Sequence, residues 1–272
     1  MRARLITIPL LAVAFVLASA GFGRGQEPAI EAVFARVDGV ELAVDIYRPA
    51  AEGVFPSVIA VHGGSWHGGD KSNWAVAAPA LAEAGMVVFA INYRLAPPGG
   101  KARYRDPLED IDRAIDWVRR KGGAFGADAS RIALLGSSAG GHLALLSARR
   151  QGRAIRGVGA WSPPTNLISL TRTGLRRPIR RFLGCSYFAC SRRYRRMSPV
   201  MRVAARQAPT FLAVSSQELI PRRQVRTLRD RLRAVGVDVV HREIRGTAHG
   251  QGLRRVVLDD TITFLQESLA RS

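Results

Sequence analysis

The chain reads Arg131-Ile-Ala-Leu-Leu-Gly-Ser-Ser-Ala-Gly-Gly-His-Leu-Ala144, and its pattern changes from strand-like to helix-like at the centre of this stretch. Residues 131–136 form an apolar run that is typical of a buried parallel strand, and residues 139–149 are typical of a helix. A Gly-x-Ser-x-Gly pattern, from Gly136 to Gly140, lies between them. Its two glycines permit a sharp turn that lifts the Ser138 hydroxyl above the sheet edge, at the amino end of the helix. Ser138 is therefore the candidate nucleophile, and a Gly/Ser-rich turn without catalytic function is the alternative.

Apolar strand-like runs alternate with helix-like stretches along the rest of the chain. Strands are expected at residues 41–47, 57–61, 86–91, 131–136, 157–161, 210–214 and 237–243, and helices at 73–84, 107–120, 139–149, 223–234 and 253–269. This alternation predicts an α/β fold with a mostly parallel central sheet, helices on both faces and an antiparallel first strand. No repeat or linker divides residues 21–272, which favours a single domain with one irregular, arginine-rich, lid-like segment at 163–208.

Directly after the strand expected at 57–61, the chain reads His62-Gly63-Gly64-Ser65-Trp66. Glycines at this place let the chain bend so that main-chain amides point toward one spot. We expect the amides of Gly64, Ser65 and Ala139 to form an oxyanion hole; a glycine turn without converging donors is the alternative. In this interpretation His62 braces the loop by hydrogen bonding, and Trp66 packs near the pocket.

A second histidine motif, Gly246-Thr-Ala-His-Gly250, follows the last expected strand. A histidine in a loop at the carboxyl end of a strand can reach Ser138 across the sheet edge. Of the five histidines, only His249 has this position late in the chain, whereas His142 is expected to pack and His241 falls within a strand. His249 is therefore the candidate general base, with a solvated loop histidine as the alternative.

Taken together, these motifs resemble those of the α/β-hydrolase superfamily across nearly the whole chain after residue 20. The resemblance is to the esterase branch that includes hormone-sensitive-lipase-like, feruloyl-esterase-like and kynurenine-formamidase-like enzymes. Its strings are His62-Gly-Gly-Ser-Trp66, Asn92-Tyr-Arg-Leu-Ala-Pro97, Pro107-Leu-Glu-Asp110, Gly126-Ala-Asp128 before Arg131-Ile-Ala, and Gly136-Ser-Ser-Ala-Gly-Gly-His-Leu-Ala144. The resemblance implies an α/β-hydrolase fold and a serine hydrolase that cleaves esters through an acyl-enzyme, without a cofactor.

The acid of the implied catalytic triad is the point at which the sequence departs from the family pattern. The family places an Asp after the strand expected at 210–214, a few residues before a Val-Pro or Ile-Pro pair. Here the chain reads Ser215-Ser-Gln-Glu-Leu-Ile-Pro221. When this loop is aligned with the family pattern by counting back from Pro221 without a gap, Gln217 takes the position of the acid. When one residue is assumed to be deleted from the loop, Glu218 takes that position. We favour Glu218, because glutamine cannot supply the charge that stabilises the imidazolium ion.

The charge of the chain is strongly positive, with 41 Lys+Arg against 21 Asp+Glu and a formal net charge of +20. Only Lys71, Lys101 and Lys121 are lysines, and no acidic residue lies between Asp128 and Glu218. Such a field attracts polyanions, but no nucleic-acid-binding motif accompanies it. We therefore expect a solvated basic surface with nonspecific polyanion contact and no dedicated nucleic-acid partner. No Cys/His cluster has metal-ligand spacing, so we expect no metal.

The amino terminus predicts export. Arg2 and Arg4 precede an apolar run over residues 5–18, and Ala18-Ser19-Ala20 supplies the small residues of a cleavage site. Residues 1–20 are therefore the expected signal peptide, and the mature protein should be periplasmic or secreted, without a membrane span; an uncleaved amino-terminal anchor is the alternative. An oxidising compartment favours a disulfide between Cys185 and Cys190, with two unpaired buried cysteines as the alternative.

These observations predict an exported serine carboxylesterase that acts on short-chain or aryl esters. Its substrate would be a small-molecule ester or an ester group on a polysaccharide, because export places the enzyme among extracellular and envelope esters. Two alternatives stay open. One is a formamidase-type amide hydrolase, and the other is a catalytically degenerate scaffold that binds an anionic polymer through its arginine-rich face.

Overall fold

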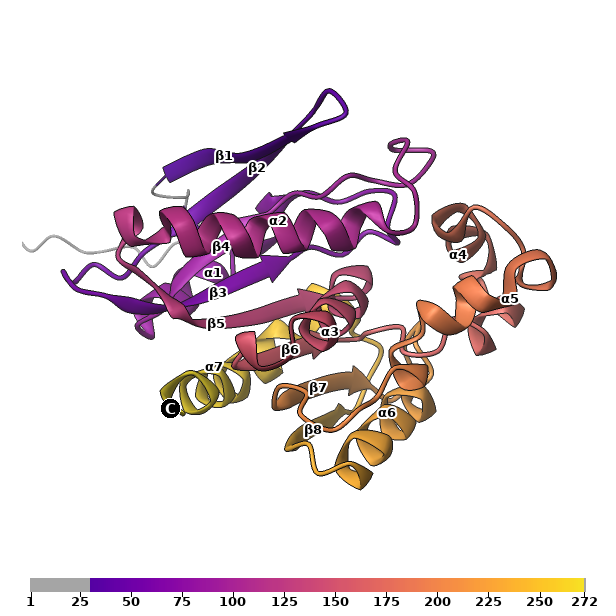
Figure 1. Cartoon of the computed structure of the whole chain (residues 1–272). Coiled ribbons are helices and arrows are strands. Elements are labelled where there is room, and N and C mark those ends of the chain that lie inside the picture. Colours follow the sequence, from indigo (N-terminus) through magenta and orange to yellow (C-terminus); the bar gives the residue numbers. More distant parts are fainter. Residues whose placement is uncertain (1–29, 272) are drawn as a thin grey trace, which may run out of the picture.

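The computed structural model describes residues 30–271, and the predicted signal peptide at 1–20 lies outside them. One sheet holds the strands β1 (Ile30–Val37), β2 (Val40–Tyr47), β3 (Phe55–Val61), β4 (Val87–Ile91), β5 (Ala127–Ser137), β6 (Gly157–Trp161), β7 (Thr210–Ser215) and β8 (Val239–Ile244). Their order across the sheet is β1-β2-β4-β3-β5-β6-β7-β8 (Figure 1). The pairs β1–β2 and β2–β4 are antiparallel, and the remaining pairs are parallel. The sheet is therefore mostly parallel, as the sequence predicts.

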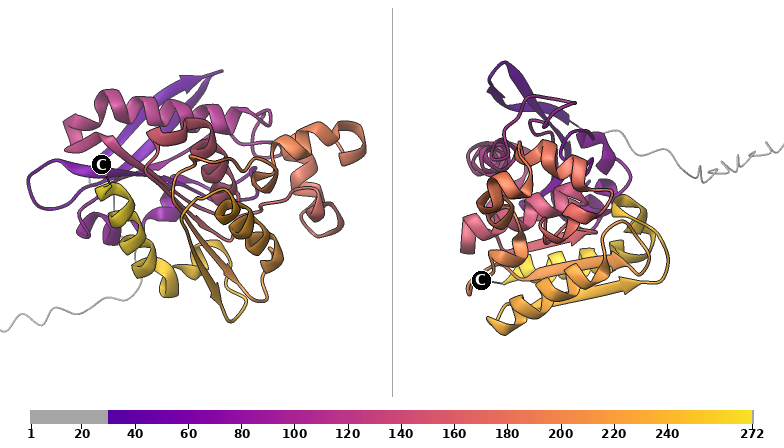
Figure 2. Two further views of the ribbon diagram at one scale, coloured as in Figure 1. Left: turned by 60° about the horizontal axis from the view of Figure 1, so that its bottom comes forward. Right: turned by 90° about the vertical axis from the view of Figure 1, so that its right-hand side faces the viewer.

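Helices cover both faces of the sheet and enclose two separate apolar cores (Figure 2). One face carries α1 (Ala78–Glu83) and α7 (Arg254–Ala270), and the other carries α2 (Asp106–Lys121), α3 (Ala139–Gln151) and α6 (Arg222–Ala234). Parallel strands read as near-continuous apolar runs because both of their faces are buried in this way. Within residues 30–271, no helix is long and apolar enough to cross a bilayer.

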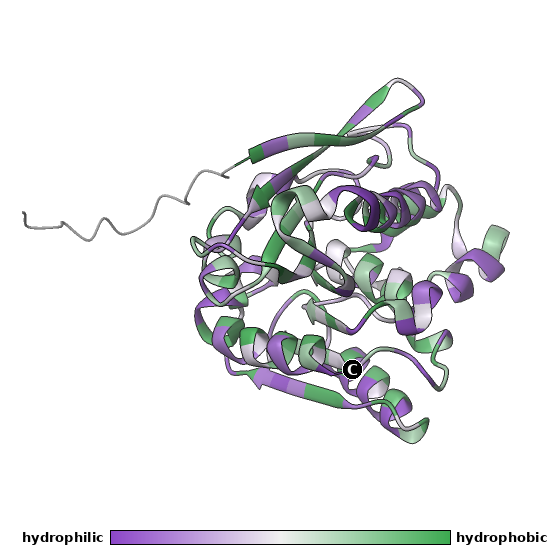
Figure 3. Ribbon diagram, turned by 60° about the vertical axis from the view of Figure 1, so that its left-hand side comes forward, coloured by the Kyte–Doolittle hydropathy of each residue, from purple (hydrophilic) through white to green (hydrophobic). Residues whose placement is uncertain are grey.

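The hydropathy of the elements follows their position in the sheet (Figure 3). All residues of β4 and β6 are buried, whereas no residue of the edge strand β8 is fully buried. Accordingly, β8 carries His241, Arg242 and Glu243 along its length. Charged side chains on an edge strand oppose pairing with another sheet.

Strand β1 was not predicted from the sequence. It pairs with β2 through a hairpin whose two turn residues, Asp38 and Gly39, have φ angles of 51° and 75°. Asp-Gly with two positive φ angles is typical of the two-residue hairpin turn that matches strand twist. This dipeptide between two apolar alternating runs was the signal that could have revealed the strand.

The helix predicted at 73–84 is wrong in extent. The structure has a short 3-10 helix, η1 (Lys71–Trp74), followed by a separate α1 that begins at Ala78. Pro79 lies in the first turn of α1, where its missing N–H group costs nothing. In a continuous helix from residue 73, the same proline would lie in the interior and break the hydrogen-bond ladder.

The sequence predicts an irregular lid-like segment at 163–208, and this prediction is wrong. The segment contains α4 (Arg176–Leu183) and α5 (Tyr187–Arg196). Both helices lie beyond the arrowheads of the parallel strands in Figure 1. Ile179, Phe182 and Leu183 give α4 a buried face at spacings of three and four residues. Four arginines and Pro178 fill the other positions of α4 and conceal this periodicity in the sequence. The structure also joins Cys185 and Cys190, between and within these helices, in a disulfide.

Tight backbone packing surrounds the turn between β5 and α3. A Cβ atom on Gly136 would overlap the carbonyl oxygen of Gly140, and a Cβ on Gly140 would overlap the carbonyl oxygens of Val61 and His62. Three backbone segments therefore meet at van der Waals contact, with no room for a side chain between them. This contact fixes the position of residue 138 relative to the end of β3.

We expect Gly140→Ala to lower the free energy of unfolding by at least about 2 kcal/mol, because the added methyl group forces strand β3 and helix α3 apart. Gly123→Ala is the matched control, since a Cβ there would meet nothing within 4 Å. That control should change the stability by less than about 1 kcal/mol. Urea unfolding followed by circular dichroism measures both variants, and equal stabilities would contradict the packing described here.

Candidate active site

Ser138 occupies the turn between β5 and α3 with backbone angles of φ 52° and ψ −120°. Left-handed φ angles are uncommon for residues other than glycine and cluster at functional sites. The turn is held because the amide of Ser138 donates to the carbonyl of Trp161 at 2.7 Å and its carbonyl accepts from the amide of His142 at 3.0 Å. The Ser138 side chain therefore stands at the amino end of α3, as the sequence predicts.

His249 directly precedes the 3-10 helix η6 (Gly250–Leu253), in the loop that follows β8. Its Nε2 lies 2.8 Å from the hydroxyl oxygen of Ser138, and its Nδ1 is hydrogen-bonded to Oε2 of Glu218. An ionised carboxylate can only accept, so in the neutral ring the proton sits on Nδ1. Nε2 then has a free lone pair that accepts the hydroxyl proton of Ser138.

Glu218 is the acidic residue that the structure brings to His249. Its side chain is fully buried, and Oε1 accepts hydrogen bonds of 2.8 Å from the hydroxyl of Ser162 and from the amide of Ser215. Gln217, the other residue allowed by the sequence, has an exposed side chain. Its backbone amide donates to the carbonyl of Gly246. The geometry thus corresponds to the alignment with one deleted residue.

Ser162 completes this network and was missed in the sequence. It is fully buried, directly follows β6 and has a φ angle of 51°. Its hydroxyl donates to Glu218 and accepts from the amide of Gly250 at 2.9 Å, so it joins the acid to the residue after His249. A polar residue at the carboxyl end of the strand next to β5 was the available signal, because such ends meet at one edge of the sheet.

The loop after β3 lies against the Ser138 turn. A Cβ on Gly63 would be 3.3 Å from the Cβ of Ser138, and Ser65 and Trp66 have φ angles of 52° and 65°. Within residues 30–271, the amides of Gly64, Ser65 and Ala139 have no protein acceptor. Their function as an oxyanion hole stays a prediction.

His62 is buried beneath this loop. Its Nδ1 lies 2.7 Å from the carbonyl of Gly63, and its ring stacks on Tyr93 with centroids 4.3 Å apart. The hydroxyl of Tyr93 donates to the carbonyl of His62 at 3.1 Å. Burial lowers the pKa of His62 to about 4, so the ring is neutral at pH 7. This geometry matches the expected brace rather than a base.

A buried polar chain connects the same loop to the lid. Nε1 of Trp66 donates to Nδ1 of His142 at 3.1 Å, so Nε2 of the neutral ring donates to the carbonyl of Met197 at 2.7 Å. The indole of Trp66 also stacks on Phe182 of α4, with centroids 4.9 Å apart. Burial lowers the pKa of His142 to about 4. His142 therefore packs, as predicted, and links the elbow helix to both neighbours.

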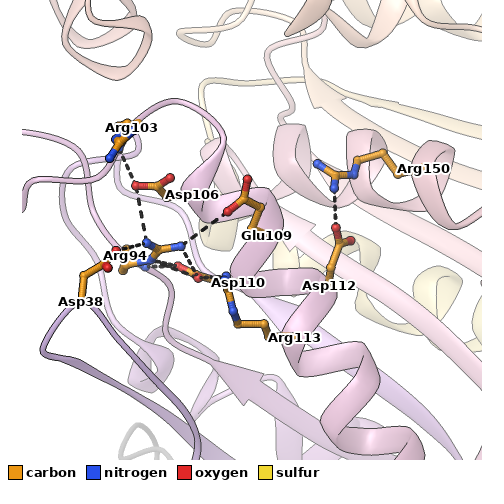
Figure 4. A network of polar contacts seen from close by, with 9 residues as sticks. All are labelled: Asp38, Arg94, Arg103, Asp106, Glu109, Asp110, Asp112, Arg113 and Arg150. Atoms are coloured by element: carbon orange, nitrogen blue, oxygen red, sulfur yellow. Dashed lines mark hydrogen bonds and ion pairs between the residues drawn. The ribbon is translucent and has the colours of Figure 1, made fainter.

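The chain after β4 is held by a buried ion pair (Figure 4). Asp110 of α2 is fully buried, and its carboxylate accepts from the backbone amide and the guanidinium of Arg94 at 2.8–3.1 Å. Arg94 also contacts Asp38 in the β1–β2 hairpin at 2.8 Å. Both Arg94 and Asp110 belong to the sequence motifs on which the family resemblance rests. These two motifs therefore contribute a buried ion pair that supports the site structurally.

The arrangement as a whole combines a hydroxyl, an imidazole and a buried carboxylate in one hydrogen-bonded series. Such a series can activate a serine for attack on a carbonyl carbon. No group of three or more His, Cys, Asp or Glu side chains in the described chain is placed to hold a metal ion.

Comparison with known proteins places the chain in a family. Residues 44–232 match the BD-FAE family. The chain belongs to this family. It is similar to the probable carboxylic ester hydrolase LipM of Mycobacterium tuberculosis, with 31% identity over 72% of this chain and 49% of that protein. Esterase LipC of the same organism is 32% identical over 72% of this chain and 53% of its own length.

A plant protein, the isoprenylcysteine alpha-carbonyl methylesterase ICME of Arabidopsis thaliana, is 29% identical over 71% of this chain and 50% of its own length. The chain thus spans about half the length of these curated relatives. Among solved structures, propionate-bound esterase 2 of Thermogutta terrifontis superposes with a TM-score of 0.74 at 22% identity, over 89% of this chain and 96% of that chain. This likeness confirms the α/β-hydrolase fold.

The buried histidines predict a loss of stability in acid. Folding lowers the pKa of His142 from 6.5 to about 4, so protonation favours the unfolded chain, and stability present above pH 6.5 is lost as the pH falls toward about 4. Each such histidine contributes a slope of about 1.4 kcal/mol per pH unit in this window. In His142→Gln, the unfolding free energy should fall less steeply than in wild type by about that amount.

Urea unfolding at successive pH values, followed by tryptophan fluorescence, measures this difference in slope. All other titrating groups are common to both proteins, so His62 and the carboxylates cancel in the comparison. Parallel pH dependences would mean that His142 is not held neutral by burial.

Proposed function

We propose that this protein is a serine carboxylesterase that hydrolyses short-chain or aryl esters. The observation that carries the proposal is the position of the His249 ring, between the Ser138 hydroxyl at 2.8 Å and the buried carboxylate of Glu218. The names of LipM, LipC and ICME, all ester hydrolases, support it.

In the proposed reaction, the Ser138 oxygen attacks the carbonyl carbon of the ester while Nε2 of His249 accepts the hydroxyl proton. The carbonyl oxygen becomes an oxyanion that the amides of Gly64, Ser65 and Ala139 stabilise. The C–O bond to the alcohol then breaks, and His249 returns the proton to the departing alkoxide.

The acyl-enzyme that remains is cleaved by the same groups. Water attacks the acyl carbon, His249 accepts its proton, and Ser138 regains that proton as the carboxylic acid departs. Glu218 remains ionised throughout and stabilises the imidazolium ion that forms in each half of the reaction.

Short acyl groups are the proposed substrates because, within residues 30–271, the lid-like segment at this edge of the sheet consists of two short helices, α4 and α5, with their connecting turns. The solved structures of Thermogutta terrifontis esterase 2 include propionate-bound and butyrate-bound forms, which supports the same range. The substrate is proposed to be a small-molecule ester or an ester group on a polysaccharide.

Export is also part of the proposal. Its support is the signal-like sequence at residues 1–20 and the Cys185–Cys190 disulfide, which is stable in an oxidising compartment. Intact mass of the protein recovered from a periplasmic extract tests it. Retention of residues 1–20 would contradict cleavage.

A fluorophosphonate probe together with an aryl acetate assay tests the reaction itself. Wild type should carry one adduct on Ser138 and turn over the ester, whereas Ser138→Ala should do neither while remaining folded. Glu218→Gln should lower kcat by about 10³ to 10⁴, because the amide cannot stabilise the imidazolium ion. Gln217→Ala is the matched control, since that side chain is exposed, and it should retain wild-type kcat.

A folded wild-type protein that gives neither adduct nor turnover would contradict the esterase assignment. It would favour a catalytically degenerate scaffold that binds an anionic polymer. Turnover of formyl-kynurenine in preference to aryl acetates and butyrates would instead indicate a formamidase. Loss of activity in Gln217→Ala with little effect of Glu218→Gln would reassign the acid.

Ser162 is proposed as a positioning residue that acts through Glu218. Ser162→Ala removes one of the two hydrogen bonds to Oε1 and should lower kcat about tenfold with little change in KM, because substrate contacts are unaffected. Ser216→Ala is the control, since the Ser216 hydroxyl accepts from the amide of Gly246 and does not contact Glu218. An increase in KM at constant kcat in Ser162→Ala would contradict a positioning role.

A further inference from the structure

An arginine-lined pocket of about 310 Å³ lies on the face of the molecule that α2 and α3 cover. It is formed by the start of α2, the second half of α3, the last residue of α5 and the segment that follows α5 as far as residue 202. Five of its lining residues are arginines: Arg105, Arg149, Arg150, Arg196 and Arg202. Tyr104 and Glu109 supply the other polar side chains that the argument below uses.

Most of these arginines have no acidic partner. Arg150 pairs with Asp112 at 2.6 Å, as Figure 4 shows. The remaining four, however, form no ion pair with any carboxylate in residues 30–271. Glu109 is partly engaged elsewhere, because its carboxylate lies 4.0 Å from the guanidinium of Arg94. The pocket therefore concentrates positive charge that the protein itself does not neutralise.

Helix ends offer a structural explanation for part of this charge. The carboxyl ends of α3 and α5 lie beside the pocket, and each carries about half a negative charge. Together with Glu109 they supply about two negative charges against four unpaired guanidinium groups, and the amino end of α2 opposes them with about half a positive charge. An excess of positive charge therefore remains among the residues that line the pocket.

We infer that this pocket binds a small oxyanion with two or more negative charges, of the kind presented by a phosphate or sulfate ester. Guanidinium groups match such groups because their planar fork donates two parallel hydrogen bonds to neighbouring oxygens. The hydroxyl of Tyr104 accepts from Nε of Arg105 at 3.0 Å and so keeps its own hydrogen for an anion. The guanidinium of Arg193 covers the Tyr104 ring at 5.0 Å from its centroid and holds it in place.

The pocket is separate from the proposed catalytic site. Ser138 stands at the amino end of α3, and Arg149 lies near its carboxyl end, which a rise of about 1.5 Å per residue places about 16 Å away. None of Ser138, His249 and Glu218 lines the pocket. The proposed anion site therefore shares no residue with the proposed catalytic triad.

Isothermal titration calorimetry with pyrophosphate at low salt tests this inference on the whole protein. Wild type should bind one pyrophosphate per chain, and Arg149→Gln/Arg202→Gln should bind at least about tenfold more weakly. The matched control is Arg223→Gln/Arg255→Gln, which removes two exposed arginines from elements that do not line the pocket. This control should keep wild-type affinity within about twofold.

Parallel titrations with inorganic phosphate and inorganic sulfate at matched ionic strength distinguish the two sources of the oxyanion. Ser138→Ala should bind pyrophosphate as wild type does, so failure of the esterase assignment would leave this result intact. Should the pocket double variant fail to fold, Arg105→Gln/Arg196→Gln replaces it, because both side chains are exposed. Equal weakening by the pocket and control variants, or no saturable binding by wild type, would overturn the inference.

Discussion

The close contact of three backbone segments around Gly136 and Gly140 is the constraint on which the rest of the site depends. It brings the start of α3 against the end of β3 and thereby fixes the position of Ser138. The chain then adopts a left-handed φ angle at a serine, which is an unfavourable conformation in isolation. Close packing of the neighbouring backbone and the hydrogen bonds of Ser138 to Trp161 and His142 hold this conformation. The hydroxyl then lies 2.8 Å from Nε2 of His249.

Buried hydrogen bonds extend this constraint from the turn to its surroundings. The indole of Trp66, the imidazole of His142 and the carbonyl of Met197 form a chain from the loop after β3, through α3, to the end of the lid. Each buried group is satisfied by the next, so removal of one would leave another unpaired at a cost of about 1–3 kcal/mol. The loop that supplies the proposed oxyanion donors is thereby held by the same helix that positions Ser138.

The sequence was sufficient for the fold class and for Ser138, because glycines at a strand end indicate close backbone approach. It also identified His249 and Glu218 from their positions after late strands, but it missed Ser162. It was insufficient where local pattern and three-dimensional context differ. Arginines hid the buried face of α4, and strand β1 was missed although the Asp38-Gly39 turn signalled a hairpin. The choice between Gln217 and Glu218 depends on the length of a loop, which no local periodicity encodes. The sequence favours Glu218 for its charge alone, and the contacts of Glu218 with His249, Ser162 and Ser215 add the geometric reason for that choice.

Charge is distributed along the chain in a way that separates two electrostatic functions. Between Asp128 and Glu218 there is no acidic side chain, so the residues that build α3, the lid-like segment and β7 carry only positive formal charges. The next acidic residue along the chain, Glu218, is the buried partner of His249. Exposed charges are screened over about 8–10 Å at physiological salt. We therefore expect the arginines of the lid-like segment to act mainly on the approach of anionic molecules, whereas in the proposed reaction local amides and Glu218 stabilise the charges that develop around Ser138. A strongly basic surface and a serine-based site can thus coexist, because water and dissolved ions screen the exposed charges from the site.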